Sequence, residues 1–154
     1  TNKTVNLSES VYSSCSVAAA AVAAHECGHA VQHAKEYAAL QLRSALVPIV
    51  NFSSMWSTWI IIIGILMIRT MPAIFWIGIA MIAMSALFSI VTLPVEYNAS
   101  ERALAWIRNN RILEGEQYLQ AETSLQWAAR TYLVAALSAI ATLIYYLGFA
   151  RNRD

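Results

Sequence analysis

The stretch AIFWIGIAMIAMSALFSIVTL, residues 73–93, decides the fold of this chain. It lies within residues 70–95, which carry no charged side chain. A helix that crosses the hydrocarbon core of a membrane needs about 20 mostly apolar residues. The stretch therefore predicts a transmembrane helix, which we place at residues 72–93.

Two further runs, residues 44–68 and 131–150, also lack charge. They predict membrane spans at residues 52–69 and 131–150, with aromatic side chains toward the ends of the spans, where aromatic belts form. A very apolar water-soluble helical bundle is the alternative, and uncharged runs of this length disfavour it. We predict an all-α membrane protein with about three transmembrane helices, in a single domain over residues 1–154.

The composition agrees with this fold class. The chain is 58% hydrophobic and 12% charged, against about 25% charged residues in ordinary soluble domains. The net charge is +1 and the basic residues are scattered, so we expect membrane lipid and no nucleic acid as a partner. The two cysteines, Cys15 and Cys27, do not form a disulfide framework.

The short loop RTMP, residues 69–72, joins the first two spans as a hairpin, and Pro72 suits the first turn of the second helix. Residues 1–43 and 96–130 are then expected on one face of the membrane. More basic residues lie in these two regions than beyond the other ends of the spans: Lys3, Lys35, Arg43, Arg102, Arg108, Arg111 and Arg130 against Arg69, Arg151 and Arg153. This bias predicts that the two regions are cytoplasmic.

Three expectations concern the segments outside the spans. The chain begins at Thr1 without methionine, so we expect an incomplete or processed N-terminus. Apolar and polar residues alternate in KTVNLSE, residues 3–9, which favours a short strand. The polar residues 108–122 indicate a solvated connection.

All three histidines lie in VAAHECGHAVQHAKE, residues 22–36. The alanine-rich composition, with Ser16 as N-cap, predicts a helix over residues 17–36. At about 100° and 1.5 Å per residue, His25 and His29 lie one turn apart on one face, with Glu26 on its flank. This His-Glu-x-x-His spacing is typical of zinc peptidases, in which two imidazoles hold one Zn²⁺ and the glutamate takes a proton from a water that the ion activates.

The other side chains of this helix fit a metal site less well. His33 lies about 12 Å along the axis from His25, too far for both to bind one ion on a straight helix. We expect His33 to support the ligands or to lie at the surface. Cys27 lies about 200° around the helix from His25 and faces away.

A catalytic zinc site keeps three protein ligands and one open position. The best candidate for the third ligand is Glu96, in LPVEYNASERAL (residues 93–104), where we expect Pro94 to start a new helix with Glu96 and Ser100 on one face. The spacing alone leaves two interpretations of Glu96 open. It is either a metal ligand or a membrane-border carboxylate that a helix N-terminus stabilises.

Three segments, residues 23–51, 92–104 and 129–147, resemble the YugP-type neutral zinc metallopeptidases of bacterial membranes, and the resemblance covers nearly the whole chain. More distantly, VEYNAS (residues 95–100) is similar to the Glu-x-x-Ala-Asp helix of the HtpX and CAAX-protease group, whose glutamate is the third zinc ligand. The resemblance implies that Glu96 is the third ligand here. The histidines then lie on a zincin-like active-site helix at the membrane border. It also implies a bacterial inner-membrane location and residues before Thr1 that include a membrane anchor. The aspartate of the distant pattern, which would orient a zinc-binding histidine, is Ser100 here. We expect Ser100 to support a histidine differently, through a weaker hydrogen bond.

Together these features predict a membrane-embedded peptidase with one Zn²⁺ held by His25, His29 and Glu96, and with Glu26 as general base. Tyr97 and Tyr132 are the candidate donors to the oxyanion. The expected substrates are peptides or membrane proteins near the cytoplasmic surface, and association with other membrane proteins is possible in this setting.

Three other kinds of protein could carry these histidines. A non-catalytic membrane subunit would keep the metal for structure and close the fourth position, with His33 or Cys27 as ligand. A haem subunit is disfavoured because the histidines share one helix. An intramembrane zinc protease with an aspartate ligand is disfavoured because the chain's one aspartate is Asp154, its last residue.

Overall fold

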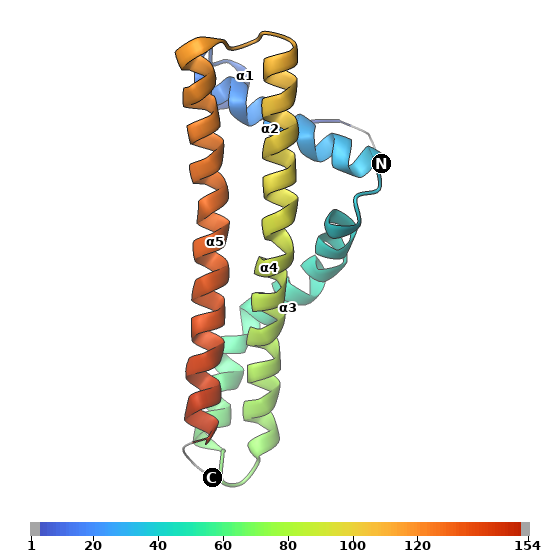
Figure 1. Cartoon of the computed structure of the whole chain (residues 1–154). Helices are drawn as coiled ribbons and strands as arrows, with labels where there is room; N and C mark the ends of the chain where they lie inside the picture. The colour runs from blue at the N-terminus through green and yellow to red at the C-terminus, as the bar shows by residue number, and fades with distance from the viewer. Residues whose placement is uncertain (1–3, 152–154) are drawn as a thin grey trace. The chain divides into compact units, whose positions relative to one another are not determined.

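Helices make up nearly all of the computed structural model, which describes residues 4–151 (Figure 1). The elements are α1 (Glu9–Tyr12), α2 (Val17–Ala34), α3 (Ala38–Leu66), α4 (Pro72–Asn109) and α5 (Gly115–Arg151). The described residues contain no strand, so the predicted all-α fold is confirmed. The short strand predicted at residues 3–9 is wrong, because residues 4–8 are irregular and α1 begins at Glu9.

The helices α3, α4 and α5 are each long and apolar enough to cross a membrane. The spans predicted at 72–93 and 131–150 lie inside α4 and α5, and most of the span at 52–69 lies inside α3, which ends at Leu66. All three helices continue well beyond the uncharged core of their spans. The solvated connection predicted at residues 108–122 is correspondingly too long, because α5 already begins at Gly115.

The predicted helix start at Pro94 is also wrong, since α4 runs through this proline without a break. A proline removes one backbone hydrogen bond from a helix, and hydroxyl side chains can help to satisfy the carbonyls around it. The carbonyl that Pro94 leaves without its backbone donor is that of Ile90, four residues earlier. Thr92 Oγ1 donates to a different carbonyl of the same helix, that of Phe88, at 2.8 Å. The helix therefore carries Glu96 as part of a continuous α4.

The chain divides into two compact units, and α4 and α5 contribute to both. Unit 1 comprises the chain up to Gln41 together with Leu93–Thr131. Unit 2 comprises Leu42–Thr92 together with the chain from Tyr132 onward. The boundaries fall close to those of the charge-free runs. Unit 2 therefore contains nearly all of the predicted spans, and unit 1 contains the histidines.

Three helices form the core of unit 1, where α2 crosses α4 and α5 near the connection that joins them (Figure 1). The Ser16 side chain accepts a hydrogen bond from the Ala19 amide at 3.1 Å and caps α2 as predicted. The helix ends at Ala34, slightly before the predicted residue 36, and Glu36 adopts a positive φ of 51°. Small side chains fill most of this core: Ala21 and Ala24 from α2, Ala103 and Ile107 from α4, and Ala121 and Leu125 from α5.

Larger side chains form the core of unit 2. Ile61, Phe75 and Ile79 are buried there, and side chains of α5 that include Leu143 and Phe149 pack against them. The helices α3 and α4 approach closely at Gly64, where an added Cβ would lie 2.6 Å from the Phe75 Cα. The predicted hairpin of the first two spans is thus tightly packed.

Candidate metal centre

Helices α2 and α4 approach each other closely at Gly28, the residue before His29. A Cβ on Gly28 would lie 2.5 Å from the Ala99 carbonyl oxygen, so only glycine lets the two backbones come this near. On either side of this contact, α2 carries the two histidines of the His-Glu-x-x-His pattern. The contact therefore holds them against the part of α4 that carries Glu96.

The imidazoles of His25 and His29 converge on one carboxylate. His25 Nε2 lies 3.1 Å from Glu96 Oε2, and His29 Nε2 lies 3.6 Å from the same oxygen. The two rings meet edge to face, with centroids 4.7 Å apart. Glu96 is buried, with 3% of its surface exposed. Water cannot stabilise the charge of this carboxylate, because the group is buried. A buried charge requires a cation or hydrogen-bond partners.

The arrangement fits a divalent zinc ion by its donor set and spacing. One ligand atom from each of His25, His29 and Glu96 lies within 4.8 Å of the others, and burial is intermediate for the histidines. A tetrahedral ion with bonds of about 2.0–2.1 Å separates its ligand atoms by about 3.3–3.4 Å. The two distances to Glu96 lie on either side of that value. Two imidazole nitrogens and one carboxylate oxygen are also the ligands of known catalytic zinc sites.

The electrostatics of the cluster favour positive charge. The Glu96 carboxylate is the main cause of a pKa of His29 above its ordinary value, and burial of the ring opposes this. Contacts with Gln32 and the nearby charge of Glu26 add to the rise in this pKa. The same negative surroundings that hold a proton on His29 would attract a metal cation in its place.

Each histidine also has a hydrogen-bond partner at its second ring nitrogen. Ser100 Oγ lies 3.1 Å from His25 Nδ1, and its role in supporting this histidine stays a prediction. Gln32 Oε1 lies 2.9 Å from His29 Nδ1, a contact that the sequence interpretation missed. The sequence does indicate that Gln32 lies on the histidine face. Gln32 comes seven residues after His25 and is therefore about 20° from it around the helix.

The remaining predicted residues of α2 lie outside this cluster. Glu26 is partly buried beside the histidines, and its charge acts on His29. His33 and Cys27 are exposed, and neither belongs to the group that can hold a metal ion among the described residues. A fourth protein ligand is thus not supplied by either of the two side chains considered for it.

The two tyrosines considered as oxyanion donors differ in position. Tyr97 directly follows Glu96 on α4 and is 46% exposed. Tyr132 lies on the part of α5 that belongs to unit 2. The role of both tyrosines stays a prediction.

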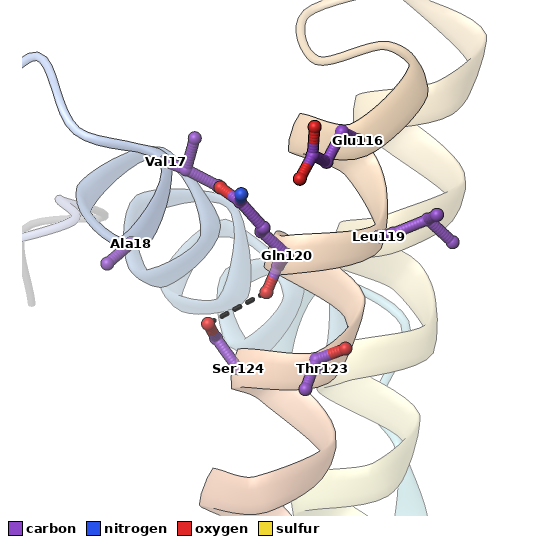
Figure 2. A pocket seen from close by; sticks show the side chains of 7 residues that line it. All are labelled: Val17, Ala18, Glu116, Leu119, Gln120, Thr123 and Ser124. Atoms are coloured by element: carbon purple, nitrogen blue, oxygen red, sulfur yellow. Dashed lines mark hydrogen bonds between the residues drawn. The ribbon is translucent and has the colours of Figure 1, made fainter.

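A separate pocket of about 560 Å³ lies in unit 1 between the first turn of α2 and the start of α5 (Figure 2). Val17 and Ala18 line it from α2, and Glu116 and Gln120 are among the residues that line it from α5. It is open and includes no residue of the histidine and glutamate cluster. This pocket is therefore distinct from the candidate metal centre.

Comparisons with known proteins agree with the chemistry of the cluster. The family model described as "Putative neutral zinc metallopeptidase" matches residues 1–151. The chain is 36% identical over 155 aligned residues to a protein of Bacillus subtilis (strain 168) described as "Putative membrane protease YugP". That match covers 100% of this chain and 68% of the relative. No solved structure matches the chain.

Proposed function

Because the chain belongs to the neutral zinc metallopeptidase family, we propose that it is a membrane-embedded zinc-dependent peptidase. In this proposal His25, His29 and Glu96 hold one Zn²⁺, and Glu26 is the general base. The observation that carries the proposal is the convergence of both histidines on the buried Glu96 carboxylate, at 3.1 and 3.6 Å. The alternative, a membrane-border charge that a helix N-terminus stabilises, is disfavoured because Glu96 lies in the interior of α4.

The reaction is the hydrolysis of a peptide bond. Zinc in such a site supplies a Lewis acid, which lowers the pKa of water toward about 7 and polarises the peptide carbonyl. Glu26 removes a proton from the attacking water, the water oxygen bonds to the carbonyl carbon, and the carbon–nitrogen bond then breaks. Glu26 passes the proton to the leaving amine, so that it acts first as base and then as acid.

The developing negative charge on the carbonyl oxygen needs a hydrogen-bond donor. Tyr97 and Tyr132 are proposed for this role, and Tyr97 is the better supported because it adjoins Glu96 and its ring is accessible. The phenol hydroxyl of either residue would donate to the oxyanion. Replacement by phenylalanine would then slow hydrolysis without reducing zinc content.

We place the protein in the bacterial inner membrane, with several membrane-spanning helices. The three long apolar helices and the relative described as a membrane protease support this location. The greater number of basic residues in regions 1–43 and 96–130 supports a cytoplasmic active site. Peptides and membrane-protein segments at that surface are the proposed substrates, and other membrane proteins are possible partners within the bilayer.

The proposal is tested with the purified full chain and the variant Glu26→Gln. The variant is expected to retain its zinc and to lose hydrolysis by about 10²–10⁴-fold, the usual contribution of a general base. Glu101→Gln, an exposed glutamate of α4, is the matched control and should cleave like the parent. If Glu26→Gln cleaves as fast as the parent, the assigned mechanism is wrong. If the parent binds zinc but hydrolyses none of the peptide and membrane-protein substrates tested, the non-catalytic alternative holds.

A further inference from the structure

Gln32 is a polar side chain that the proposed reaction does not use, and it is fully buried, with 0% of its surface exposed. It lies on α2 and reaches α4. Its Nε2 donates to the Val95 carbonyl at 2.8 Å and to Asn98 Oδ1 at 3.0 Å. Its Oε1 lies 2.9 Å from His29 Nδ1. A buried side-chain amide with all of these contacts connects a histidine of the candidate metal centre to the backbone of the opposite helix.

The orientation of the Gln32 amide follows from its partners. A backbone carbonyl only accepts hydrogen bonds, so the atom of Gln32 that faces Val95 must be the amide nitrogen. Asn98 gives independent support, because Arg102 Nε donates to Asn98 Oδ1 at 2.8 Å. The asparagine atom in this contact must be an oxygen, since the arginine group only donates. The amide oxygen of Gln32 is therefore the atom that faces His29.

Two acceptors face the His29 ring: Gln32 Oε1 lies 2.9 Å from Nδ1, within hydrogen-bond distance, whereas Glu96 Oε2 lies 3.6 Å from Nε2, beyond it. The closer contact favours a proton on Nδ1 of the neutral ring. The Gln32 oxygen accepts only, so a neutral His29 ring bonds to it through a protonated Nδ1. The lone pair of the ring then lies on Nε2, the atom 3.6 Å from Glu96 Oε2. We propose that Gln32 is a positioning residue that fixes the tautomer and ring orientation of His29 for metal binding, an inference that rests on the proposed metal site.

The partner of the other histidine does not act in the same way. Ser100 Oγ lies 3.1 Å from His25 Nδ1, but a hydroxyl can donate or accept and can rotate. Ser100 therefore accommodates either tautomer of His25. The two ligands are supported unequally, and the rigid support belongs to His29.

The tautomer is measured directly on the metal-free full chain in detergent micelles, labelled with ¹⁵N at histidine. Nitrogen chemical shifts and couplings are recorded at a pH where the rings are neutral, with the exposed His33 as the internal reference and with His33→Gln for assignment. His29 is expected in the Nδ1-protonated form. A His29 ring protonated at Nε2 overturns the proposal. This measurement needs no Gln32 variant and no bound zinc, so its outcome does not depend on whether the protein is a peptidase.

Metal binding is measured on Gln32→Met, which keeps the length of the side chain and removes its hydrogen bonds. Zinc affinity, measured by competition with a chelating dye, is expected to fall about 10–100-fold, as is usual when the hydrogen-bond partner of a metal-binding histidine is removed. The visible spectrum of the Co²⁺-loaded protein should also change, because the ligand geometry changes. Ser100→Ala is the matched control and should lose less affinity than Gln32→Met.

The outcomes separate this inference from the proposed function. Unchanged zinc affinity and an unchanged cobalt spectrum in a folded Gln32→Met protein would overturn the role of Gln32, while the parent's zinc-dependent hydrolysis would stand. If the parent binds no zinc, the proposed function fails instead. If Gln32→Met does not fold, the tautomer of the parent decides the question.

Discussion

The two units of this protein solve the same packing problem with different side chains. Both hold α4 and α5 segments against a third helix, α2 in unit 1 and α3 in unit 2. Alanines dominate the core of unit 1, whereas Ile61, Phe75 and Ile79 form the core of unit 2. Small side chains allow the helix backbones to come close together. Polar side chains of one helix can then reach hydrogen-bond partners on the other helix.

The buried polar groups of the two units differ accordingly. In unit 1, Gln32 and Glu96 are buried and make contacts between α2 and α4. In unit 2, the buried Thr92 hydroxyl bonds back to the Phe88 carbonyl of its own helix. The polar contacts of unit 1 therefore build a site, whereas this contact of unit 2 serves the helix that contains it. The proposed chemistry belongs to unit 1, and the following predictions test that division.

The largest effect is expected from removal of the central carboxylate of unit 1. Glu96→Ala should reduce zinc affinity more than about 100-fold, beyond the loss typical of a supporting residue, because a direct ligand disappears. Zinc content is measured by metal analysis after dialysis against a weak chelator. Glu101→Ala, which changes an exposed glutamate five residues after Glu96 on α4, should keep its zinc. Equal zinc content in both variants would remove Glu96 from the site.

The second prediction compares one close helix contact in each unit. Gly28→Ala and Gly64→Ala each place a Cβ within 2.6 Å of a facing backbone atom. Each should lower the free energy of unfolding by about 1–3 kcal/mol, as overpacking usually does. Zinc affinity of the folded protein should fall only for Gly28→Ala, because only that contact aligns the histidines with α4. A similar loss of zinc in Gly64→Ala would show that the units are not functionally separate.

The third prediction compares large-to-small changes in the two cores. Ile107→Ala removes a side chain with 0% exposure from unit 1 and should lower the free energy of unfolding by about 2–5 kcal/mol. Ile79→Ala in unit 2 should cost less, because lipid tails are as apolar as isoleucine and only packing is lost. Denaturant unfolding in micelles, followed by circular dichroism, measures both. Equal losses would mean that unit 2 is stabilised as a water-soluble core is.

The smallest effect is the dependence of unit 1 on pH. Zinc and the proton compete for His29, whose pKa is raised above its ordinary value by the Glu96 carboxylate. Zinc affinity should fall as the pH is lowered through this raised pKa, by up to about tenfold per pH unit for each displaced proton. Stability of the metal-free protein changes in the opposite sense. The protonated ring contributes stability below the pKa of the unfolded chain, and this is lost as the pH rises through the folded pKa.

Calorimetric titration with zinc between pH 6 and 8 measures this competition. Unit 2 provides the contrast, because residues 42–92 and 132–151 contain no histidine, aspartate or glutamate. Its unfolding should not change over the same range of pH. A zinc affinity that is independent of pH would contradict the placement of His29 in the site.

The sequence by itself determined the all-α fold and the three long apolar helices, because the hydrophobic effect acts on composition and the charge-free runs are long enough to cross a bilayer. It also placed His25, Glu26 and His29 on one helix, since helical geometry is local and the spacing of three residues fixes their face. The capping of α2 by Ser16 is local in the same sense, and the structure confirms it.

Local signals failed where neighbouring segments determine the outcome. Proline is usually a helix boundary, but α4 continues through Pro94. The alternation in residues 3–9 favoured a strand, but the described residues 4–8 contain none, and a strand needs a partner for its backbone groups. The polar start of α5 resembled a loop, yet Ala121 and Leu125 bury one face of it against the other helices of unit 1.

Only the tertiary structure decided how the site is completed. Spacing left Glu96 with two interpretations, and the family resemblance implied that it is a ligand. The distances of 3.1 and 3.6 Å to the histidines bring it into the cluster. The support of His29 by Gln32 depends on the Val95 carbonyl, a backbone group that every residue has and that no sequence pattern marks. The reason is physical: a metal site requires atoms to meet within a few tenths of an ångström, and that precision comes from the packing of α2 on α4.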